Sequence, residues 1–358
     1  MSASTESQSR HATRLLTEPW EHALLGRMAS RIAMTAMTRS FAGPGHVATR
    51  EMASYYAARA HGDVGFILTE STAVCPEGDG FPRMPRIHTA DQIASWRLVT
   101  DAVHATGAPI FSQLLHCGRI THQDYTDGEQ PVSATERQAS GINRRNQKPY
   151  AIPRRLHADE LPRITDVFRR AAVGALDAGF DGVELHLAHG YLADQFFDGR
   201  INDRSDRYGG SIENRSRFGL ELTSAILSEC GPARVMVRLS PARWMGGPYD
   251  WPDLHDMLSY LVPALDDAGL RLLDVSCARA DYHQTSGRVV RIIRPMWRHF
   301  LMAGASLSKR DAQAEIDAGL LDMVTYGRLL IANPDLVQRF RDDAELRAYH
   351  ESMLETLV

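Results

Sequence analysis

Three side chains that can donate hydrogen bonds or protons fall within six residues of the sequence: His186, His189 and Tyr191. They follow the short apolar run 182–185, which is long enough to form a buried strand. A buried strand that carries imidazole and phenol groups at its C-terminal end is typical of the way a parallel α/β barrel presents its chemistry. A single histidine is more often a structural group, but three such side chains so close together favour a catalytic site.

The elements that would position this site alternate along the chain. Buried strands are predicted at 32–39, 64–68, 109–115, 182–185, 235–239, 272–275, 300–303 and 323–326, and helices at 49–61, 91–106, 164–176, 211–229, 252–268, 287–297 and 308–318. Strands and helices that alternate at this spacing imply a parallel sheet. Eight strands, with at least seven helices following them, predict an α/β fold of the (β/α)8 TIM-barrel type in a single domain.

Three segments do not follow that alternation. Residues 1–18 are predicted to be a disordered tail, and residues 19–342 the barrel. Residues 117–157, after the third strand, are rich in Gly, Pro, Gln and Arg and predict a lid-like insertion. Residues 343–358 are predicted to form an amphipathic C-terminal helix, because apolar side chains recur there at helical spacing: Leu346, Tyr349, Met353 and Leu357.

The insertion carries a group of cations: Arg137, Arg144, Arg145, Lys148, Arg154 and Arg155. One hypothesis is that they contact a phosphate of an incoming substrate. The simpler interpretation, which we favour, is a solvated surface hairpin.

Composition excludes several classes of protein. The formal net charge of −4 over 358 residues indicates neither a nucleic-acid-binding protein nor one that binds an anionic membrane surface. The four cysteines lie far apart without a CxxC pair, which argues against an iron–sulfur or zinc site, so no metal is predicted, and fits a reducing compartment. The polar N-terminus lacks the apolar core of a signal peptide, and no run approaches the ~18 apolar residues of a membrane span. We therefore expect a cytoplasmic enzyme, monomeric or homo-oligomeric, with a small-molecule substrate.

Other polar groups fall at the predicted strand ends: Thr38, Ser71, Gln113, Arg238, Gly304 with Ala305, and Gly327 with Arg328. The loops after the last two strands of a barrel frequently bind phosphate, and Arg328 would add a charge-assisted contact there. Gln113 offers a donor and an acceptor to an imide edge such as the pyrimidine ring of a flavin, and Arg238 would stabilise the anion formed on its reduction. Each signal alone is weak, because a glycine at a strand end is more often a turn and Arg238 is equally suited to a structural ion pair.

Longer motifs make the pattern specific. The segment LHLAHGYLADQFFDGRINDRSDRYGGSIENR resembles the signature of the old yellow enzyme family of flavin oxidoreductases. Further matches are MTAMTR, QLLHCGR, VRLSP and YGRLLIANPDL, in the order and spacing of that family from about residue 20 to 340.

The resemblance implies roles for the residues at the strand ends. Thr38 would approach N5 and O4 of flavin mononucleotide (FMN), and Gln113 and Arg238 would hold its pyrimidine edge. Gly304, Ala305, Gly327 and Arg328 would surround the phosphate. His186 and His189 would bind the carbonyl oxygen of the substrate, with Tyr191 as the proton donor. Ser71 stands where the family usually has alanine or glycine, and either adds a hydrogen bond to the isoalloxazine or is merely tolerated.

The activity that the resemblance implies is reduction of the C=C bond of α,β-unsaturated carbonyl or nitro compounds. Hydride would come from flavin N5 and the proton from Tyr191, and NADH or NADPH would re-reduce the flavin. No GxGxxG or P-loop string occurs, so a separate Rossmann domain is not expected. Two alternatives stay open: a flavin-dependent isomerase or desaturating dehydrogenase, and a flavin-binding protein without turnover.

Overall fold

The structure is a computed structural model that describes residues 15–143, 145–244, 247–278 and 280–357. Eight parallel strands in this part of the chain close into a barrel, and their order around the ring is their order in the sequence. They are β3 (Ile32–Met34), β4 (Phe66–Ala73), β5 (Ile110–Leu115), β10 (Gly182–His186), β11 (Val235–Arg238), β14 (Leu272–Asp274), β15 (Phe300–Ala303) and β16 (Met323–Tyr326). This topology confirms the predicted TIM barrel.

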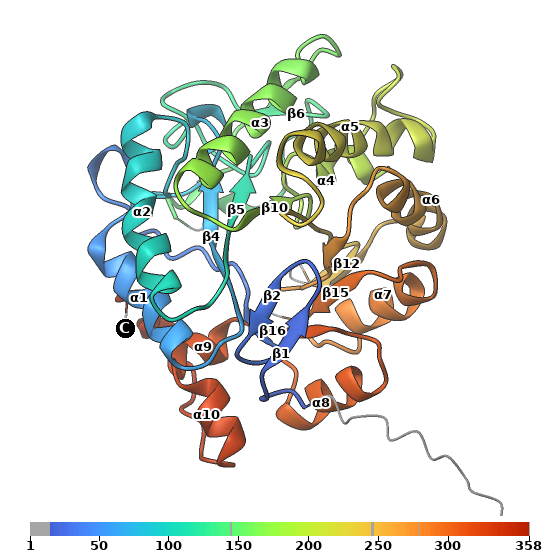
Figure 1. Cartoon of the computed structure of the whole chain (residues 1–358). Helices are drawn as coiled ribbons and strands as arrows, with labels where there is room; N and C mark the ends of the chain where they lie inside the picture. The colour runs from blue at the N-terminus through green and yellow to red at the C-terminus, as the bar shows by residue number, and fades with distance from the viewer. Residues whose placement is uncertain (1–14, 144, 245–246, 279, 358) are drawn as a thin grey trace, which may run out of the picture.

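Helices form a ring around the strands (Figure 1). Those that follow the strands are α1 (Arg50–His61), α2 (Ala90–His104), α3 (Leu161–Asp177), α5 (Ile212–Cys230), α6 (Leu254–Asp267), α7 (Ser286–Ile293) and α8 (Lys309–Asp317), with the short α9 (Arg328–Ala332) and α10 (Leu336–Arg341) after the last strand. The hydroxyls of Thr49, Thr89, Ser211 and Ser308 cap four of them by accepting a backbone N–H of the first turn. A cap of this kind typically stabilises a helix by about 1 kcal/mol.

Apolar side chains fill the half of the barrel interior that lies towards the N-terminal ends of the strands. They include Phe66, Leu68, Phe111, Met236, Leu272, Met302 and Met323, all at most 1% exposed. The hairpin of β1 (Trp20–His22) and β2 (Gly26–Met28) lies across this end of the barrel, in front of the strands in Figure 1, and buries Met28 against the same cluster. Chemistry is therefore confined to the opposite, C-terminal end of the strands.

The tail predicted over residues 1–18 overlaps the described part of the chain at residues 15–18. Residues 1–14 lie outside the described part of the chain, but Leu16 is buried and tied to the barrel. Its backbone N–H donates to Gln313 (2.9 Å), and its carbonyl accepts the N–H of Arg31 (2.9 Å). The disorder predicted for residues 1–18 is therefore wrong at Leu16.

The prediction of a helix over residues 343–358 is wrong. The described residues of this segment contain only one 3-10 turn, η4 (Glu351–Leu354). Arg39 donates to the carbonyls of Met353 (2.9 Å) and Thr356, and Asn333 exchanges two hydrogen bonds with the backbone of Arg347 (2.8 and 3.1 Å). A helix would need those backbone groups for its own hydrogen bonds, so tertiary contacts override the helical spacing of the apolar residues.

The insertion after β5 contains two small sheets, a parallel pair of β6 (Val132–Ser133) with β9 (Arg154–Arg155) and a hairpin of β7 (Ile142–Asn143) with β8 (Lys148–Pro149). The hairpin agrees with the simpler of the two interpretations made from the sequence. Further short elements are η1 (Pro44–His46), η2 (Pro76–Gly78), α4 (Asp194–Phe197), the pair β12 (Ala242–Trp244) and β13 (Pro248–Asp250), and η3 (Arg294–Met296).

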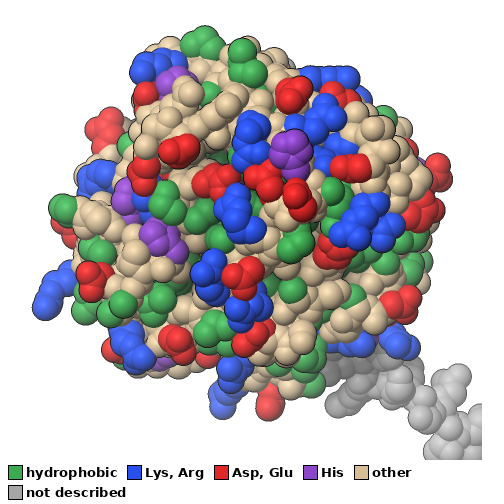
Figure 2. Space-filling view, turned by 90° about the horizontal axis from the view of Figure 1, so that it is seen from above, with side chains coloured by type: hydrophobic (Ala, Val, Ile, Leu, Met, Phe, Trp, Pro, Cys, Tyr) green, Lys and Arg blue, Asp and Glu red, His purple; other side chains and the backbone are tan. Residues whose placement is uncertain are grey.

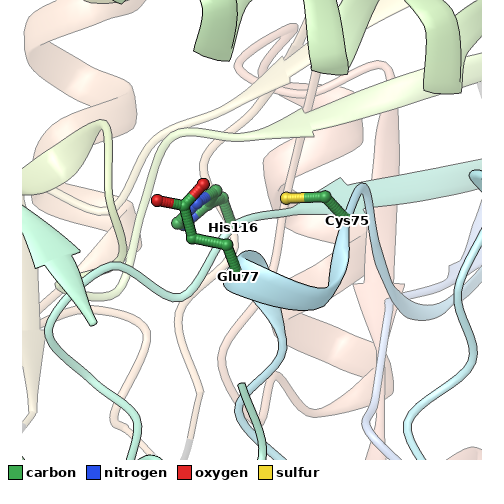
Figure 3. Close-up of side chains that lie close together, drawn as sticks. All are labelled: Cys75, Glu77 and His116. Carbon is green, nitrogen blue, oxygen red and sulfur yellow. The ribbon is translucent and has the colours of Figure 1, made fainter. Parts of the chain in front are cut away.

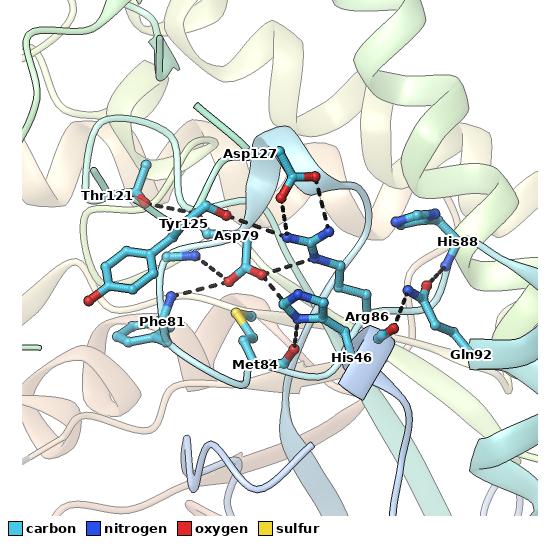
Figure 4. A network of polar contacts seen from close by, with 12 residues as sticks. His46, Asp79, Phe81, Met84, Arg86, His88, Gln92, Thr121, Tyr125 and Asp127 are labelled. Atoms are coloured by element: carbon cyan, nitrogen blue, oxygen red, sulfur yellow. Dashed lines mark hydrogen bonds and ion pairs between the residues drawn. The ribbon is translucent and has the colours of Figure 1, made fainter. Parts of the chain in front are cut away.

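A buried carboxylate fixes the base of the insertion (Figure 4). Asp79 pairs with Arg86 (3.0 Å), which also reaches Asp127 in the insertion (3.3 Å). The backbone carbonyl of Asp79 accepts the hydroxyl of Thr121 (2.8 Å), and His46 lies 3.5 Å from the Asp79 carboxylate. The loop after β4 and the start of the insertion are thus held together by one charged network.

The surface shown in Figure 2 carries Lys and Arg side chains interspersed with Asp and Glu, so this face has no extended field of one sign. Within the ranges that the structure describes, no helix has the length and apolar character that crossing a bilayer requires.

Candidate active site

The turn after β10 places the two predicted histidines. His186 ends the strand and faces the barrel interior, because side chains alternate along a strand. His189 has φ of 58° and Gly190 φ of 79°, and two successive left-handed residues reverse the chain sharply. A left-handed histidine is uncommon and needs support from its surroundings. The hydroxyl of Ser240, just after β11, provides it by accepting the His189 N–H at 2.8 Å.

A buried aspartate, which the sequence analysis did not single out, holds the rest of this turn. Asp194 accepts the N–H of Gly190 and the indole N–H of Trp251 (2.7 Å), and it forms an ion pair with Arg243. Asp194 is 0% exposed and Arg243 2%. The signal for Asp194 was its place inside the DQFFDGR part of the signature, but its partners lie 49 and 57 residues further along the chain.

All of the predicted site residues meet at one cavity of about 410 Å³ at the C-terminal end of the strands. Its lining includes His186, His189, Tyr191, Thr38, Ser71, Gln113, Arg238, Gly304, Ala305, Gly327 and Arg328. Sequence reasoning missed Trp244, Tyr349 and Leu354, which also line it. Tyr349 and Leu354 reach the cavity because the C-terminal segment runs across the barrel mouth instead of forming a helix.

The two histidines are electrically neutral. Burial, and next the positive charge of Arg238, lower the pKa of both imidazoles well below the usual value. Nδ1 of His189 lies 3.3 Å from Nε2 of His186, while His186 Nδ1 and His189 Nε2 have no partner among the described residues. A neutral imidazole carries one N–H, so while this contact holds, the pair can offer only one free donor. Two donors become available when the contact opens.

Tyr191 lies directly beside this pair. Its ring packs edge-on against His186, with the ring centroids 4.9 Å apart. Burial, followed by the nearby Cys117 thiol, raises the pKa of the Tyr191 phenol far above its ordinary value. The phenol therefore keeps its proton throughout the neutral range.

Gln113 is held from both sides at the centre of the cavity floor. Its carboxamide oxygen accepts the hydroxyl of Ser71, and its NH2 group donates to Glu184. Each end of the amide keeps further hydrogen-bonding capacity, an acceptor on the Ser71 side and a donor on the Glu184 side. That polarity fits the N3–H and a carbonyl of a flavin imide edge. The Ser71 hydroxyl thus has a partner within the chain, which the sequence did not reveal.

Arg238 lies beside Gln113 with its guanidinium group largely fixed. It donates to the carbonyl of Ser276 through Nε (3.3 Å) and Nη2 (3.1 Å), and its Nε lies 3.5 Å from the carboxylate of Asp274. Arg238 is 3% exposed and still lines the cavity. A buried cation thereby lines the same cavity as the amide of Gln113.

Packing requires the glycine at the end of β15 and leaves little room for a side chain at the end of β16. A Cβ on Gly304 would collide with the carbonyl oxygen of Thr325, and one on Gly327 would lie 3.0 Å from the sulfur of Met37. Arg328 is exposed, donates to the Ser306 hydroxyl (3.2 Å) and lies against the ring of Tyr349 (5.9 Å to the ring centroid). A small-residue wall beside an exposed guanidinium group is compatible with a phosphate.

The loop that carries Thr38 is fixed by Glu70. One carboxylate oxygen of Glu70 accepts the backbone N–H groups of Arg39 (3.0 Å) and Ser40 (2.9 Å). Burial raises the pKa of Glu70 to about 7, although these two hydrogen bonds oppose the shift. The position of Thr38 at the cavity therefore depends on a titratable group next to Ser71.

A second cluster of polar side chains lies just after the ends of β4 and β5 (Figure 3). The potential ligand atoms of Cys75, Glu77 and His116 are within 4.8 Å of one another. Arg163 already binds both oxygens of Glu77 (3.0 and 3.3 Å), and the Gly118 N–H occupies Nδ1 of His116 (3.1 Å). Burial raises the pKa of the Cys75 thiol to about 12, which disfavours the thiolate that metals prefer. We interpret the cluster as a structural contact between the ends of β4 and β5.

Comparison with known proteins agrees with this geometry. Residues 25–347 match the model of the NADH:flavin oxidoreductase / NADH oxidase family. The rice (Oryza sativa subsp. japonica) protein named 12-oxophytodienoate reductase 7 is 40% identical over 344 residues, which cover 90% of this chain and 87% of the relative. The Arabidopsis thaliana 12-oxophytodienoate reductase 2 is 34% identical over 363 residues, covering 98% and 94%.

Solved structures give the same result. The old yellow enzyme homologue from Zymomonas mobilis superimposes with a TM-score of 0.89 at 35% identity and covers 95% of this chain and 96% of its own. Morphinone reductase superimposes with a TM-score of 0.87 at 34% identity, covering 97% and 94%. The chain belongs to the NADH:flavin oxidoreductase / NADH oxidase family, the family of the old yellow enzymes that its sequence resembles.

Proposed function

We propose that this cavity is the active site of an FMN-dependent reductase of activated C=C bonds, with His186 and His189 as the oxygen-binding pair and Tyr191 as the proton donor. The observation that carries the assignment is their convergence, from one strand and its turn, on a cavity whose floor is formed by Gln113 and Arg238. Family membership gives FMN as the cofactor and NADH or NADPH as the reductant.

The residues present fit FMN. Gln113 and Arg238 would hold the pyrimidine edge, Thr38 and Ser71 would contact the ring, and Gly304, Ala305, Gly327 and Arg328 would surround the phosphate. The fit is supported by the unfilled hydrogen-bonding capacity of Gln113, which its two protein partners orient. When bound, the flavin would accept hydride from the nicotinamide and supply it to the substrate.

The protein contributes charge stabilisation and a proton. Hydride addition to an enone places negative charge on the carbonyl oxygen, so donors fixed there stabilise the transition state more than the ground state. Opening of the 3.3 Å contact between His186 and His189 gives that oxygen two N–H donors. Loss of one such donor typically raises the barrier by on the order of 3 kcal/mol. Tyr191, protonated at neutral pH, then delivers its proton to the α-carbon.

One cation of the insertion is suited to recognise an anionic group on a ligand. The other described cations named from the sequence have carboxylate partners: Arg137 with Asp203, Lys148 with Asp124, Arg154 with Glu160, and Arg155 with Asp203. Arg144 lies outside the described residues. Arg145 has no carboxylate partner among them and lines the cavity. We assign Arg145 to a phosphate of the nicotinamide cofactor or an anionic group of the substrate.

Anaerobic half-reactions test the function. The purified protein should be yellow with a releasable FMN, should bleach on mixing with NADH or NADPH, and should regain its colour when cyclohexenone is added. A reduced enzyme that no enone or nitroalkene reoxidises would refute the reductase assignment. The relatives named above are reductases, which favours reduction over isomerisation or desaturation.

A further inference from the structure

Two buried carboxyl groups beneath the cavity have no part in the proposed reaction. Glu184 lies on β10 two residues before His186, and Asp274 ends β14. Strand alternation points both side chains into the barrel, and both residues are 0% exposed. Carboxyl groups are rarely buried so completely unless they are paired.

Each carboxyl group of this pair has one oxygen that forms hydrogen bonds and one that forms none with the described residues. One oxygen of Glu184 accepts the NH2 group of Gln113, and Oδ1 of Asp274 accepts the backbone N–H (2.7 Å) and the hydroxyl of Ser276. The remaining oxygens, Glu184 Oε1 and Asp274 Oδ2, are buried without a hydrogen-bond partner among the described residues, although the two side chains interact directly. Two ionised carboxylates only accept hydrogen bonds, so a single proton between these oxygens would satisfy both.

The charges around the pair lead to the same conclusion. The cation that faces it is Arg238 from β11, 3.5 Å from Asp274 Oδ2, and the neutral polar neighbour is Gln113 from β5. Two ionised carboxylates against one arginine would leave a net negative charge in a site closed to water, which is costly. One proton makes the cluster neutral. Asp274, with Ser276 and Arg238 as donors, is the better-stabilised anion, so the proton belongs on Glu184.

We propose that Glu184 and Asp274 form a proton-binding site beneath the pyrimidine edge of FMN: one proton, carried on Glu184 Oε1 and directed at Asp274 Oδ2, leaves Arg238 facing a single negative charge. Consistent with this, burial and then the charge of Asp274 raise the pKa of Glu184 well above its ordinary value. Both residues act as positioning groups, Glu184 through Gln113 and Asp274 through Arg238. The effect on the flavin rests on the proposed placement of FMN.

Infrared spectroscopy of the holoenzyme tests the shared proton without using the reaction. Burial also raises the pKa of Asp79 and Asp194, which are paired with Arg86 and Arg243, and that of Glu70, which at a pKa of about 7 has ionised by about pH 9. We expect a protonated-carboxyl C=O band there that shifts in D2O. The band should persist in Glu70→Gln, the matched control, and be absent in Glu184→Gln. A native protein without such a band, or a band that Glu184→Gln leaves in place, would overturn the shared proton.

The redox potential of the bound flavin tests the charge. In Glu184→Gln an amide N–H replaces the shared proton at the same place, so the ratio of oxidised- to reduced-FMN dissociation constants should change less than threefold. If both carboxyls were ionised, the same substitution would remove a full negative charge and favour reduced FMN at least tenfold, about +30 mV for a two-electron couple. We expect that tenfold change only in Glu184→Gln/Asp274→Asn. An unchanged potential in the double variant, with FMN still bound, would overturn the coupling to the flavin.

Discussion

Replacing Tyr191 by phenylalanine removes one hydroxyl from the cavity and leaves its packing intact. The ring keeps its edge-on contact with His186 at 4.9 Å, and the hydroxyl makes no hydrogen bond to the residues that the structure describes. The variant should therefore fold and bind FMN normally. Its defect should be confined to proton delivery.

The size of that defect follows from the role and the exposure of the phenol. A positioned general acid contributes typically ~10²–10⁴-fold to a rate. Because Tyr191 is partly exposed to the cavity, solvent can replace it in part, so we expect the lower end, a loss of about 100-fold. Since the pKa of the native phenol is raised far above its usual value, loss of the Tyr191 proton should not limit the native rate at neutral pH.

Stopped-flow measurement of the two half-reactions separates the steps. Reduction of the flavin by NADH or NADPH needs no proton from Tyr191 and should be unchanged in Tyr191→Phe, while reoxidation by cyclohexenone should slow. Tyr349→Phe is the matched control, because it removes a hydroxyl from the same cavity beside Arg328. Equal enone rates in native protein and Tyr191→Phe would refute the assignment, as would a rate in Glu70→Gln that falls as pH rises through the neutral range, because that variant lacks the titration of Glu70.

Two further substitutions and one deletion test other parts of the site. Burial raises the pKa of Glu70 from 4.5 to about 7, so the folded state binds the proton more tightly than the unfolded state. The native protein therefore loses stability as pH rises across that interval, whereas Glu70→Gln does not. Urea unfolding should show the free energy of unfolding of Glu70→Gln, relative to that of the native protein, increasing by about 3 kcal/mol over this pH range. Arg145→Gln should raise the KM for NADH, NADPH or an anionic enone about tenfold, since it removes a charged contact of ~1.5 kcal/mol. Arg137→Gln is the control: Arg137 is already paired with Asp203, so this substitution should not change the steady-state kinetics. Deleting 343–358 removes Tyr349 and Leu354 from the cavity wall and should speed FMN release about tenfold, measured by flavin fluorescence.

The sequence predicted the barrel because its signal is local and repeated. Each buried strand is a short apolar run, and the structure places all eight where the pattern predicts them. The strand ends differ most at β3, which ends at Met34 instead of residue 39, and at β4, which was expected to end at residue 68 but continues to Ala73 through polar residues that are all buried. A register shift between Leu68 and Ser71 brings Ser71 opposite Gln113. Bulges near active sites redirect side chains in this way, and nothing in the local sequence marks them.

The supporting residues of the site were harder to foresee. Asp194 depends on Arg243 and Trp251, and Glu184 lies inside an apolar run where a single acidic residue does not disturb the strand pattern. The C-terminal segment shows the converse error: its helical spacing is real, but Arg39 and Asn333 bind its backbone. In each case the deciding contact joins residues distant in sequence, whereas periodicity reports only on near neighbours.

The positions of the functional groups and their charge states therefore differ in how far sequence can predict them. A motif fixes which side chains reach the cavity, since strand ends of a closed barrel converge on one place. Whether those side chains are charged depends on burial and on the partners that other strands bring. His186 and His189 stay neutral because burial lowers the pKa of both imidazoles, and next because the same Arg238 that is suited to the flavin edge repels a proton from them. Neutral imidazoles suit the proposed reaction, because an N–H without a full positive charge stabilises an oxygen as its charge develops, and leaves proton delivery to Tyr191.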